Sequence, residues 1–438
     1  MKSMAGPHRR AFDRSTPSDD RRSGLRTVIL PALVVAAAMG ASSIVAQAEA
    51  ALACDTPGGW VDVKTGRSVD RAELFHDLVA KSGVVLLGES HTDVNHHQWQ
   101  LHTLAALHGR GGNIVIGFEA FPRRVQPVLD EWIAGKLTEE AFLKASEWRQ
   151  VWGYDAALYM PLFQFARLNR IPMIALNVER SLVARVGREG WEAIPESERE
   201  GLTNPAPASA AYQHELARIY LLKKTMPPGA EPSAGPRELP DPDEAALAEA
   251  MQEPEFKRFV EAQLTWDRAM AEALAAAKRR FPDATIVGVL GSGHVEDGHG
   301  VPHQLKDLGV MVQTTLIPES VDTACKVVGT PYADAIFTLP RPEKTAAPER
   351  PRLGVLLAPG DGAPRISQVV RGSVAEATGL QVGDHVVRAA GLETRIPDDL
   401  VEIVGRQAPG TWLPLSIRRQ GQEIDLIAKF PARPRQDR

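Results

Sequence analysis

Four side chains that can bind a metal ion or move a proton directly follow short apolar segments of the sequence: Glu89, His91, Glu119 and His294. Two imidazoles and two carboxylates are enough for three metal ligands, an open coordination position and a general base. In that arrangement His91, Glu119 and His294 hold the metal, and Glu89 activates a water molecule. This is the chemistry of a metal-dependent hydrolase. The same residues also allow a hydrogen-bonded network that only stabilises loops, so both interpretations stay open here.

The apolar segments themselves are typical of strands buried on both faces of a parallel sheet. They occupy residues 84–87, 114–118, 172–176 and 285–290, and the third ends at Asn177. Helical patterns separate them, which predicts an α/β protein with a largely parallel sheet flanked by helices. Ligands of such sheets bind beyond the carboxyl ends of the strands. We therefore expect one cleft lined by the four residues above and Asn177.

A helix predicted over 94–108 carries further histidines that resemble a metal-binding cluster. His97 and His108 fall among apolar residues and are expected to pack in the core. His96 is expected to face solvent. Of these neighbours, only His91 stands at the corner between strand and helix, where a ligand is expected.

Aromatic residues are concentrated between 148 and 159, although aromatic residues make up only 6% of the chain. Packing against the sheet accounts for any single ring. As a set beside the cleft, these rings could also form a wall for a flat apolar ligand.

The first 48 residues have the pattern of an export signal. An arginine-rich stretch precedes an apolar run over 28–45, and Ala46-Gln47-Ala48 fits a cleavage site. A retained membrane anchor fits less well, because the run is short and rich in small residues. The signal predicts a protein of the periplasm or cell envelope. A net charge of −5 without a basic stripe argues against nucleic acid as a partner.

The chain has two cysteines, Cys54 and Cys325. In an oxidising compartment they can form a disulfide that links the start of the mature domain to its end. Alternatively, Cys54 carries a lipid anchor, which would make the protein a lipoprotein with Cys325 free. We favour the disulfide slightly.

A proline-rich stretch over 331–351 predicts a linker between two domains. Beyond it, residues 352–432 combine short strands with a helix, a turn and a strand over 372–387, and they resemble a PDZ domain of the bacterial periplasmic type. PDZ domains typically add a peptide to a sheet edge and bind its carboxylate. The resemblance implies a protein partner and a carboxylate-binding loop formed by Leu353, Gly354 and Val355. A purely regulatory PDZ module stays an alternative.

The strand-end motifs, taken together with residues 262–271, are similar to those of the ChaN-type haem-binding domain. These motifs are Gly88-Glu89-Ser90-His91, Phe118-Glu119, Leu176-Asn177 and Gly291-Ser292-Gly293-His294. ChaN belongs to one superfamily with the Tiki proteins and erythromycin-esterase-like hydrolases. The resemblance implies a domain over about 55–330 and a function in iron uptake or haem handling.

The ChaN resemblance also implies a cofactor, b-type haem. Haem iron accepts His or Tyr as an axial ligand, and apolar groups must cover the porphyrin. Tyr159, Tyr154 and Trp152 are the expected contacts. The Tiki branch, with its paired Gly-x-x-His motifs, keeps a divalent metal ion and hydrolase activity open. Whether the protein is an enzyme, and its oligomeric state, are also left open.

Overall fold

A computed structural model describes residues 53–76, 81–225, 242–341 and 351–432 of the chain. The predicted export signal and residues 342–350 of the predicted linker lie outside these ranges. Within them, no helix is long and apolar enough to cross a bilayer.

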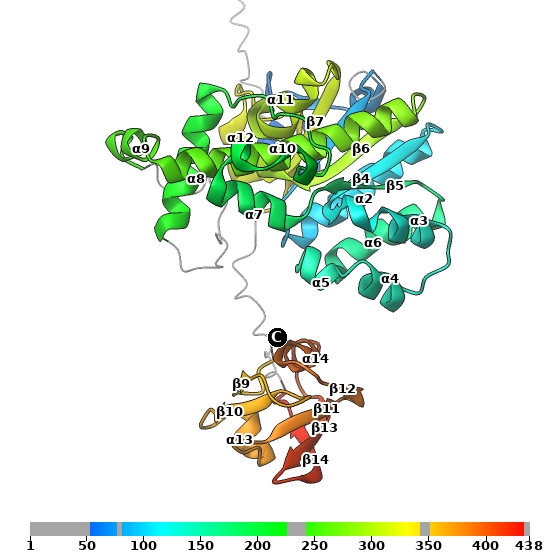
Figure 1. The fold of residues 1–438 in the computed structure, drawn as a ribbon. Coiled ribbons are helices and arrows are strands. Elements are labelled where there is room, and N and C mark those ends of the chain that lie inside the picture. Colours follow the sequence, from blue (N-terminus) through cyan, green and yellow to red (C-terminus); the bar gives the residue numbers. More distant parts are fainter. Residues whose placement is uncertain (1–52, 77–80, 226–241, 342–350, 433–438) are drawn as a thin grey trace, which may run out of the picture. The chain divides into compact units, whose positions relative to one another are not determined.

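The first domain is built on an eight-stranded sheet with the strand order β2-β1-β8-β7-β3-β6-β4-β5 (Figure 1). Six neighbouring strands, from β8 to β5, pair in parallel, and β1 pairs antiparallel with β8 and β2. This architecture confirms the predicted fold class. The strands are β1 (Trp60–Asp62), β2 (Ser68–Val69), β3 (Val84–Glu89), β4 (Ile114–Pro122), β5 (Met173–Asn177), β6 (Thr285–Gly291), β7 (Gln313–Ser320) and β8 (Ala335–Leu339).

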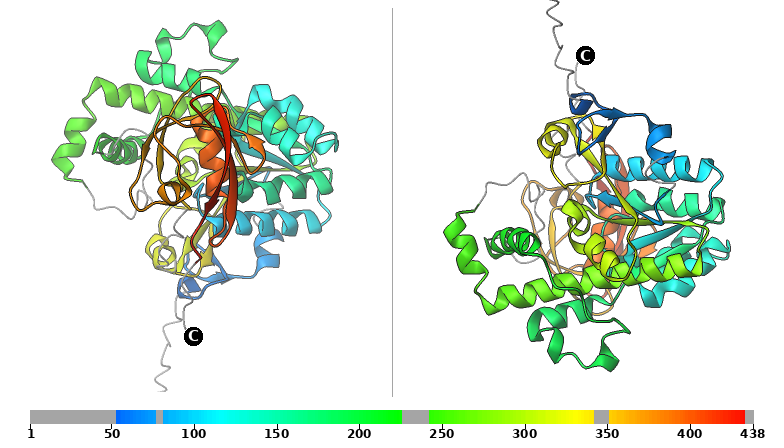
Figure 2. Two further views of the ribbon diagram at one scale, coloured as in Figure 1. Left: turned by 90° about the horizontal axis from the view of Figure 1, so that it is seen from below. Right: turned by 90° about the horizontal axis from the view of Figure 1, so that it is seen from above.

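Helices lie on both faces of this sheet (Figures 1 and 2). The described α-helices of the domain are α1 (Arg71–Leu74), α2 (Val94–Gly109), α3 (Gln126–Ile133), α4 (Glu139–Ala145), α5 (Trp148–Val151), α6 (Ala156–Leu168), α7 (Arg180–Glu189), α8 (Ala210–Thr225), α9 (Glu244–Ala250), α10 (Pro254–Arg280), α11 (Gly300–Asp307) and α12 (Val321–Val327). Short 3-10 helices η7 (Ser292–His294) and η8 (Glu296–Gly298) follow β6.

Strand β3 shows why helices must cover both faces. All six of its residues are buried, and successive side chains point to opposite faces. Val85 and Leu87 join the core beneath α2, α3 and α6, whereas Val84 and Leu86 join the core beneath α10 and α11. A strand whose apolar side chains point to both faces therefore needs a helical layer on each side.

The C-terminal module has its own antiparallel sheet, in the order β14-β13-β11-β10-β9, with β12 paired to β11. Its elements are β9 (Val355–Ala358), β10 (Arg365–Val369), α13 (Val374–Thr378), β11 (His385–Ala389), β12 (Leu392–Glu393), α14 (Pro397–Gly405), β13 (Trp412–Arg419) and β14 (Gln422–Lys429). A separate apolar core that includes Ile366, Val386 and Leu415 lies inside it. This module is the PDZ-like fold predicted from the sequence.

The predicted boundary at 330 is wrong, because the first domain continues through β8. This strand lies inside the predicted linker and pairs in parallel with β7, from Leu316–Ala335 to Ser320–Leu339. Proline at 331 and 340 suggested a linker, but both prolines flank the strand, where no ladder hydrogen bond is lost. The linker therefore begins about ten residues later than expected.

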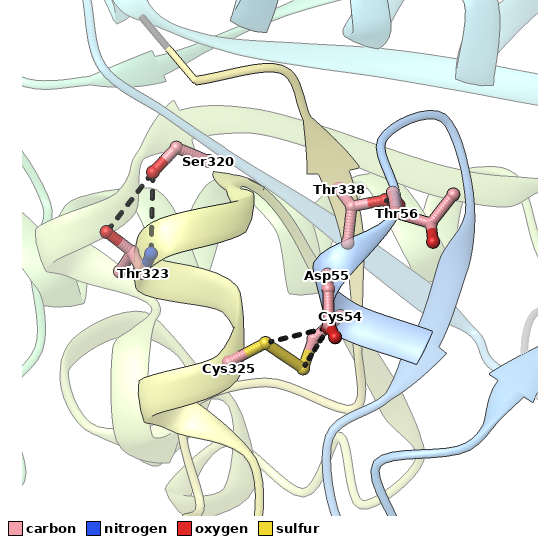
Figure 3. Close-up of a disulfide and its surroundings, with 7 residues drawn as sticks. All are labelled: Cys54, Asp55, Thr56, Ser320, Thr323, Cys325 and Thr338. Atoms are coloured by element: carbon pink, nitrogen blue, oxygen red, sulfur yellow. Dashed lines mark hydrogen bonds between the residues drawn. A yellow bond between two sulfur atoms is a disulfide. The ribbon is translucent and has the colours of Figure 1, made fainter. Parts of the chain in front are cut away.

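The structure pairs Cys54 with Cys325 in a disulfide (Figure 3). The bond joins the 3-10 helix η1 (Ala53–Asp55) to α12, across a sequence separation of 271 residues. It uses the Cys54 sulfur that a lipid anchor would need, so the structure favours the first of the two alternatives. The bridge connects the first described element of the domain to an element near its end.

We predict that replacing both cysteines by serine lowers the free energy of unfolding by roughly 2–5 kcal/mol, because the unfolded chain is no longer constrained by a long loop. Chemical denaturation of the oxidised protein measures the difference. The matched control is the same comparison under reducing conditions, where wild type and variant should coincide. Mass spectrometry that finds free thiols, or a lipid on Cys54, would contradict the prediction.

Candidate functional site

The candidate site lies at the carboxyl ends of three neighbouring parallel strands, β3, β6 and β4. Glu89 ends β3 directly opposite Gly291, the last residue of β6. Glu119 lies in β4, on the other side of β6, and His294 follows β6 in η7. Residues more than 170 positions apart in the chain therefore meet at one edge of the sheet, as predicted.

Glu89 is a buried carboxylate that three side chains surround. Tyr159 of α6 donates a hydrogen bond from its hydroxyl to Oε1 (2.5 Å), and His91 Nδ1 lies 2.9 Å from the same oxygen. His97 Nδ1 of α2 lies 3.1 Å from Oε2. Burial raises the pKa of Glu89, but the hydrogen bonds from His91 and His97 outweigh it and hold the pKa well below its usual range. Glu89 is thus a buried anion.

We expected His97 to pack in the core. It is buried there, and it also belongs to the polar cluster around Glu89. Its Nε2 faces the main-chain oxygen of His91 at 3.1 Å, and its Nδ1 faces Gln100 Oε1 at 3.2 Å as well as Glu89. All of these neighbours are acceptors, which suits an imidazolium with two donors. Burial lowers the pKa of His97, but the Glu89 carboxylate raises it more, and the net shift is upward.

His91 is the most accessible member of this cluster. Its side chain is 24% exposed, and the rings of Trp152 and Tyr154 lie 4.7 and 5.0 Å from its ring. Because Glu89 occupies Nδ1, the other ring nitrogen, Nε2, is available to a ligand. Burial lowers the pKa of His91, but the Glu89 and Glu119 carboxylates raise it by more than burial lowers it. The net shift of the pKa is therefore upward.

A second imidazole–carboxylate pair faces the first. His294 Nδ1 lies 2.6 Å from Oδ1 of Asp267, a fully buried residue of α10. The other oxygen of Asp267 accepts a hydrogen bond from the Tyr212 hydroxyl of α8 (2.9 Å). Burial lowers the pKa of His294, but Glu119 and Asp267 raise it to about 9. Nδ1 of His294 is therefore also tied to a carboxylate, and Nε2 is left for other contacts.

Glu119 lies between the two pairs. Its Oε2 accepts a hydrogen bond from the Gly291 main-chain N–H (2.6 Å), and its Oε1 lies 3.5 Å from His294 Nε2. A side chain at Gly291 would come within 2.9 Å of His91 Cε1, so the absence of a Cβ makes room for the His91 ring. Asn177 supports this corner, because its amide donates to the Glu119 main-chain oxygen (3.2 Å).

Chemically, the site offers two imidazoles, each held by a buried carboxylate at Nδ1, together with the Glu119 carboxylate, whose Oε1 lies 3.5 Å from His294 Nε2. A carboxylate on Nδ1 fixes the tautomer and orientation of a histidine that binds metal through Nε2. Among the described residues, however, the sets of three ligand atoms that all lie within 4.8 Å of one another do not include His91, Glu119 and His294. A single small ion bound by all three would require the side chains to move closer.

Two predicted site residues, Glu89 and Tyr159, have different contacts in the structure from those we expected. Glu89 was the expected general base, but both of its oxygens face other side chains and it orients His91 instead. Tyr159 was an expected haem contact, but it is only 1% exposed and its hydroxyl is bonded to Glu89. Burial and the Glu89 charge raise the pKa of Tyr159 far above its usual value, so it stays a neutral phenol.

Sequence reasoning missed Asp267 and Tyr212 as members of the site. Asp267 lies in the segment 262–271, which contributed to the family resemblance, so its position carried a usable signal. Tyr212 lies in a part of the chain without such a motif. Only the packing of α8 against α10 brings it to Asp267.

In the C-terminal module, the predicted carboxylate-binding loop leads into β9. Leu353 is buried, and its main-chain oxygen accepts a hydrogen bond from Ala375 of α13 (2.7 Å). Gly354 has φ +84, and a side chain there would clash with Ser373. These contacts hold the loop against α13 in a conformation that requires glycine. Peptide binding by Leu353, Gly354 and Val355 stays a prediction.

Comparison with known proteins gives a family match for the first domain. Residues 75–305 match the family described as haem-binding uptake, Tiki superfamily, ChaN. The chain is similar to a solved structure described as cofacial heme binding to ChaN of Campylobacter jejuni, at 18% identity and a TM-score of 0.45. That alignment covers 64% of this chain and 95% of the other.

Two further matches are short. The chain is 35% identical over 72 residues to a probable periplasmic serine endoprotease, DegP-like, of Hahella chejuensis. That match covers 16% of this chain and only 15% of the relative. The solved PDZ domain of HtrA3 bound to a phage-derived ligand is 22% identical, with a TM-score of 0.16, and the match covers 18% of this chain and 83% of that domain.

We predict that Gly291→Ala lowers the free energy of unfolding by about 1–3 kcal/mol, because the added methyl group displaces the His91 ring in a packed corner. Chemical denaturation measures the loss, and the His91 imidazole resonances in an NMR spectrum should shift. Gly293→Ala is the matched control: nothing lies within 4 Å of a Cβ at that position, so a change within about 0.5 kcal/mol is expected. Equal effects of the two substitutions would refute the proposed contact.

Proposed function

The chain belongs to the ChaN family of haem-binding uptake proteins in the Tiki superfamily, and it carries a PDZ-like module. From this premise we propose that it binds b-type haem in the strand-end cleft, the site formed by His91, Glu119 and His294. Its function is then haem or iron handling in the cell envelope. The observation that carries this proposal is the accessible imidazole of His91, which a buried carboxylate orients and aromatic rings flank.

The residues of the cleft fit a haem group. His91 would hold the iron through Nε2, since Nδ1 is held by Glu89, and Trp152 and Tyr154 would supply aromatic surface next to it. When bound, haem provides an iron centre that accepts this nitrogen. Tyr159 acts through Glu89 as a positioning residue, because a neutral phenol buried against a carboxylate is a poor iron ligand.

Export to the periplasm agrees with the disulfide between Cys54 and Cys325, because such bonds persist in oxidising compartments. The PDZ-like module provides a protein-interaction surface at Leu353, Gly354 and Val355. A peptide with a free carboxylate is the partner that this kind of loop recognises. We propose that the module brings the haem-binding domain to an envelope protein.

We predict that hemin titration of the full exported chain gives a saturable Soret shift, and that His91→Ala weakens binding at least about tenfold, equivalent to about 1.4 kcal/mol. Tyr159→Phe, which keeps the ring but frees Glu89, should weaken binding less. Affinity should rise with pH, because a proton on His91 competes with iron for Nε2 and the pKa of His91 is raised.

The control variant is His102→Ala, which removes an exposed histidine of α2 outside the cleft. It should bind hemin as wild type does. A wild-type titration without saturation would end the haem proposal. Equal weakening in His102→Ala and His91→Ala would remove His91 from it.

A second candidate, metal-dependent hydrolysis, rests on the pairing of both cleft histidines with carboxylates. His91 with Glu89 and His294 with Asp267 have the form of carboxylate–histidine–metal triads. Glu119, beside both rings, is then the third ligand or the group that accepts a proton from water. A divalent ion would have to draw these groups closer than they now lie.

For this candidate we predict that metal content falls by one equivalent per chain in His91→Ala and in His294→Ala. Glu89→Gln should weaken metal binding by only ~10–100-fold, as loss of a supporting hydrogen bond does. Elemental analysis of the purified variants, with His102→Ala as the control, measures the effect. Unchanged metal content in the His91→Ala/His294→Ala double variant would exclude this site.

A further inference from the structure

A second cluster of potential metal ligands lies outside the strand-end cleft. Glu215 of α8, Asp297 of η8 and His299, the residue before α11, line a cavity of about 420 Å³. Their ligand atoms all lie within 4.8 Å of one another. Among the described residues, the other group that meets this criterion contains Cys54 and Cys325, whose sulfurs form the disulfide.

The spacing of this cluster approaches that of a bound ion. His299 Nδ1 lies 3.1 Å from Glu215 Oε2. Two ligand atoms at bond lengths of ~2.0–2.2 Å around a tetrahedral centre lie roughly 3.3–3.6 Å apart. If these two atoms move slightly apart, an ion fits between them. Asp297 adds a third ligand from another part of the loop.

The cavity also has the charge and accessibility that a cation needs. The side chains of Glu215 and His299 are each 18% exposed, so ions can reach them from solvent. His214 and Glu244 line the same cavity, with His214 Nε2 3.6 Å from Glu244 Oε2. Three carboxylates thus line the cavity, against a single guanidinium group.

The loop that carries two of the ligands is held firmly. Asp297 adopts the left-handed conformation (φ 55), and its main-chain N–H donates to the Tyr332 oxygen at 3.0 Å. At Gly300, a Cβ would lie 2.5 Å from the His294 main-chain oxygen, so this position needs glycine. The ligands are therefore presented by a loop with little freedom to rearrange.

From this geometry we propose that Glu215, Asp297 and His299 form a binding site for a divalent first-row transition-metal ion. Two carboxylates and one imidazole suit Zn²⁺, Mn²⁺, Fe²⁺ or Co²⁺, whereas Mg²⁺ and Ca²⁺ prefer oxygen ligands alone. The site uses none of the residues that we propose to bind haem. It is nevertheless connected to the cleft, because the Tyr212 ring lies 5.2 Å from the His299 ring and its hydroxyl binds Asp267, the partner of His294.

The test is a Co²⁺ titration of the full chain, followed by visible absorption and by calorimetry, with Mg²⁺ for comparison. It is carried out in wild type and in the His91→Ala/His294→Ala variant, which lacks the cleft histidines. Glu215→Gln, His299→Gln and Asp297→Asn each remove one ligand; asparagine is chosen because it tolerates a positive φ. The matched controls are Glu249→Gln and His102→Gln, at exposed positions outside the cavity.

We expect one Co²⁺ per chain to remain in the His91→Ala/His294→Ala variant and Mg²⁺ to bind far more weakly. Each ligand variant should lose affinity by more than the ~100-fold that loss of a supporting contact costs. Circular dichroism confirms that each variant is folded before it is scored. The proposal is overturned if wild type binds no Co²⁺, or if folded Glu215→Gln and Asp297→Asn bind it as tightly as the controls.

Discussion

The buried charge of Glu89 is the constraint on which the candidate site depends. A carboxylate enclosed at the end of a central strand is costly unless hydrogen bonds and opposite charges surround it. Here those partners come from three elements: Tyr159 from α6, His97 from α2, and His91 from the corner after β3. Removing one partner of such a buried pair typically costs about 3–5 kcal/mol. The packing of α2 and α6 on the sheet and the orientation of His91 are therefore linked through one carboxylate.

The same principle operates on the other side of the cleft. Asp267 is fully buried within α10, and it is satisfied by Tyr212 from α8 and by His294 from the loop after β6. Each side thus combines three groups, a tyrosine hydroxyl, a carboxylate and an imidazole. The tyrosine and the carboxylate are buried, and the imidazole is turned toward Glu119. The His91 and His294 rings are in this way held at the sheet edge by buried groups behind them.

Close packing of the main chain at Gly291 completes this arrangement. The Gly291 N–H binds Glu119, and the missing side chain leaves space for the His91 ring. Glu119 consequently lies beside both imidazoles and raises the pKa of each. A proton at these nitrogens would compete with a metal ion or haem iron, so the proposed ligand binding would depend on pH.

The sequence by itself determined the parallel sheet, the PDZ-like module and the meeting of His91, Glu119 and His294 at one edge. Buried strands have a strong local signature, and polar residues that follow parallel strands necessarily reach the same side of the sheet. The end of the first domain was not predicted correctly. Prolines flank β8 in the sequence and suggested a linker, but β8 pairs with β7 and belongs to the domain.

Only the tertiary structure decided what each side chain does. Burial along α2 does not follow from residue type alone, because Val94 is 49% exposed whereas Trp99 is only 4% exposed. Glu89 resembles a general base in the sequence, but His97 and Tyr159 reach it through packing and make it an orienting group. Tyr212 and Asp267 meet only because α8 packs against α10. The identity of a residue sets the chemistry it can perform, whereas its hydrogen-bond partners come from distant segments, and these partners fix its charge and accessibility.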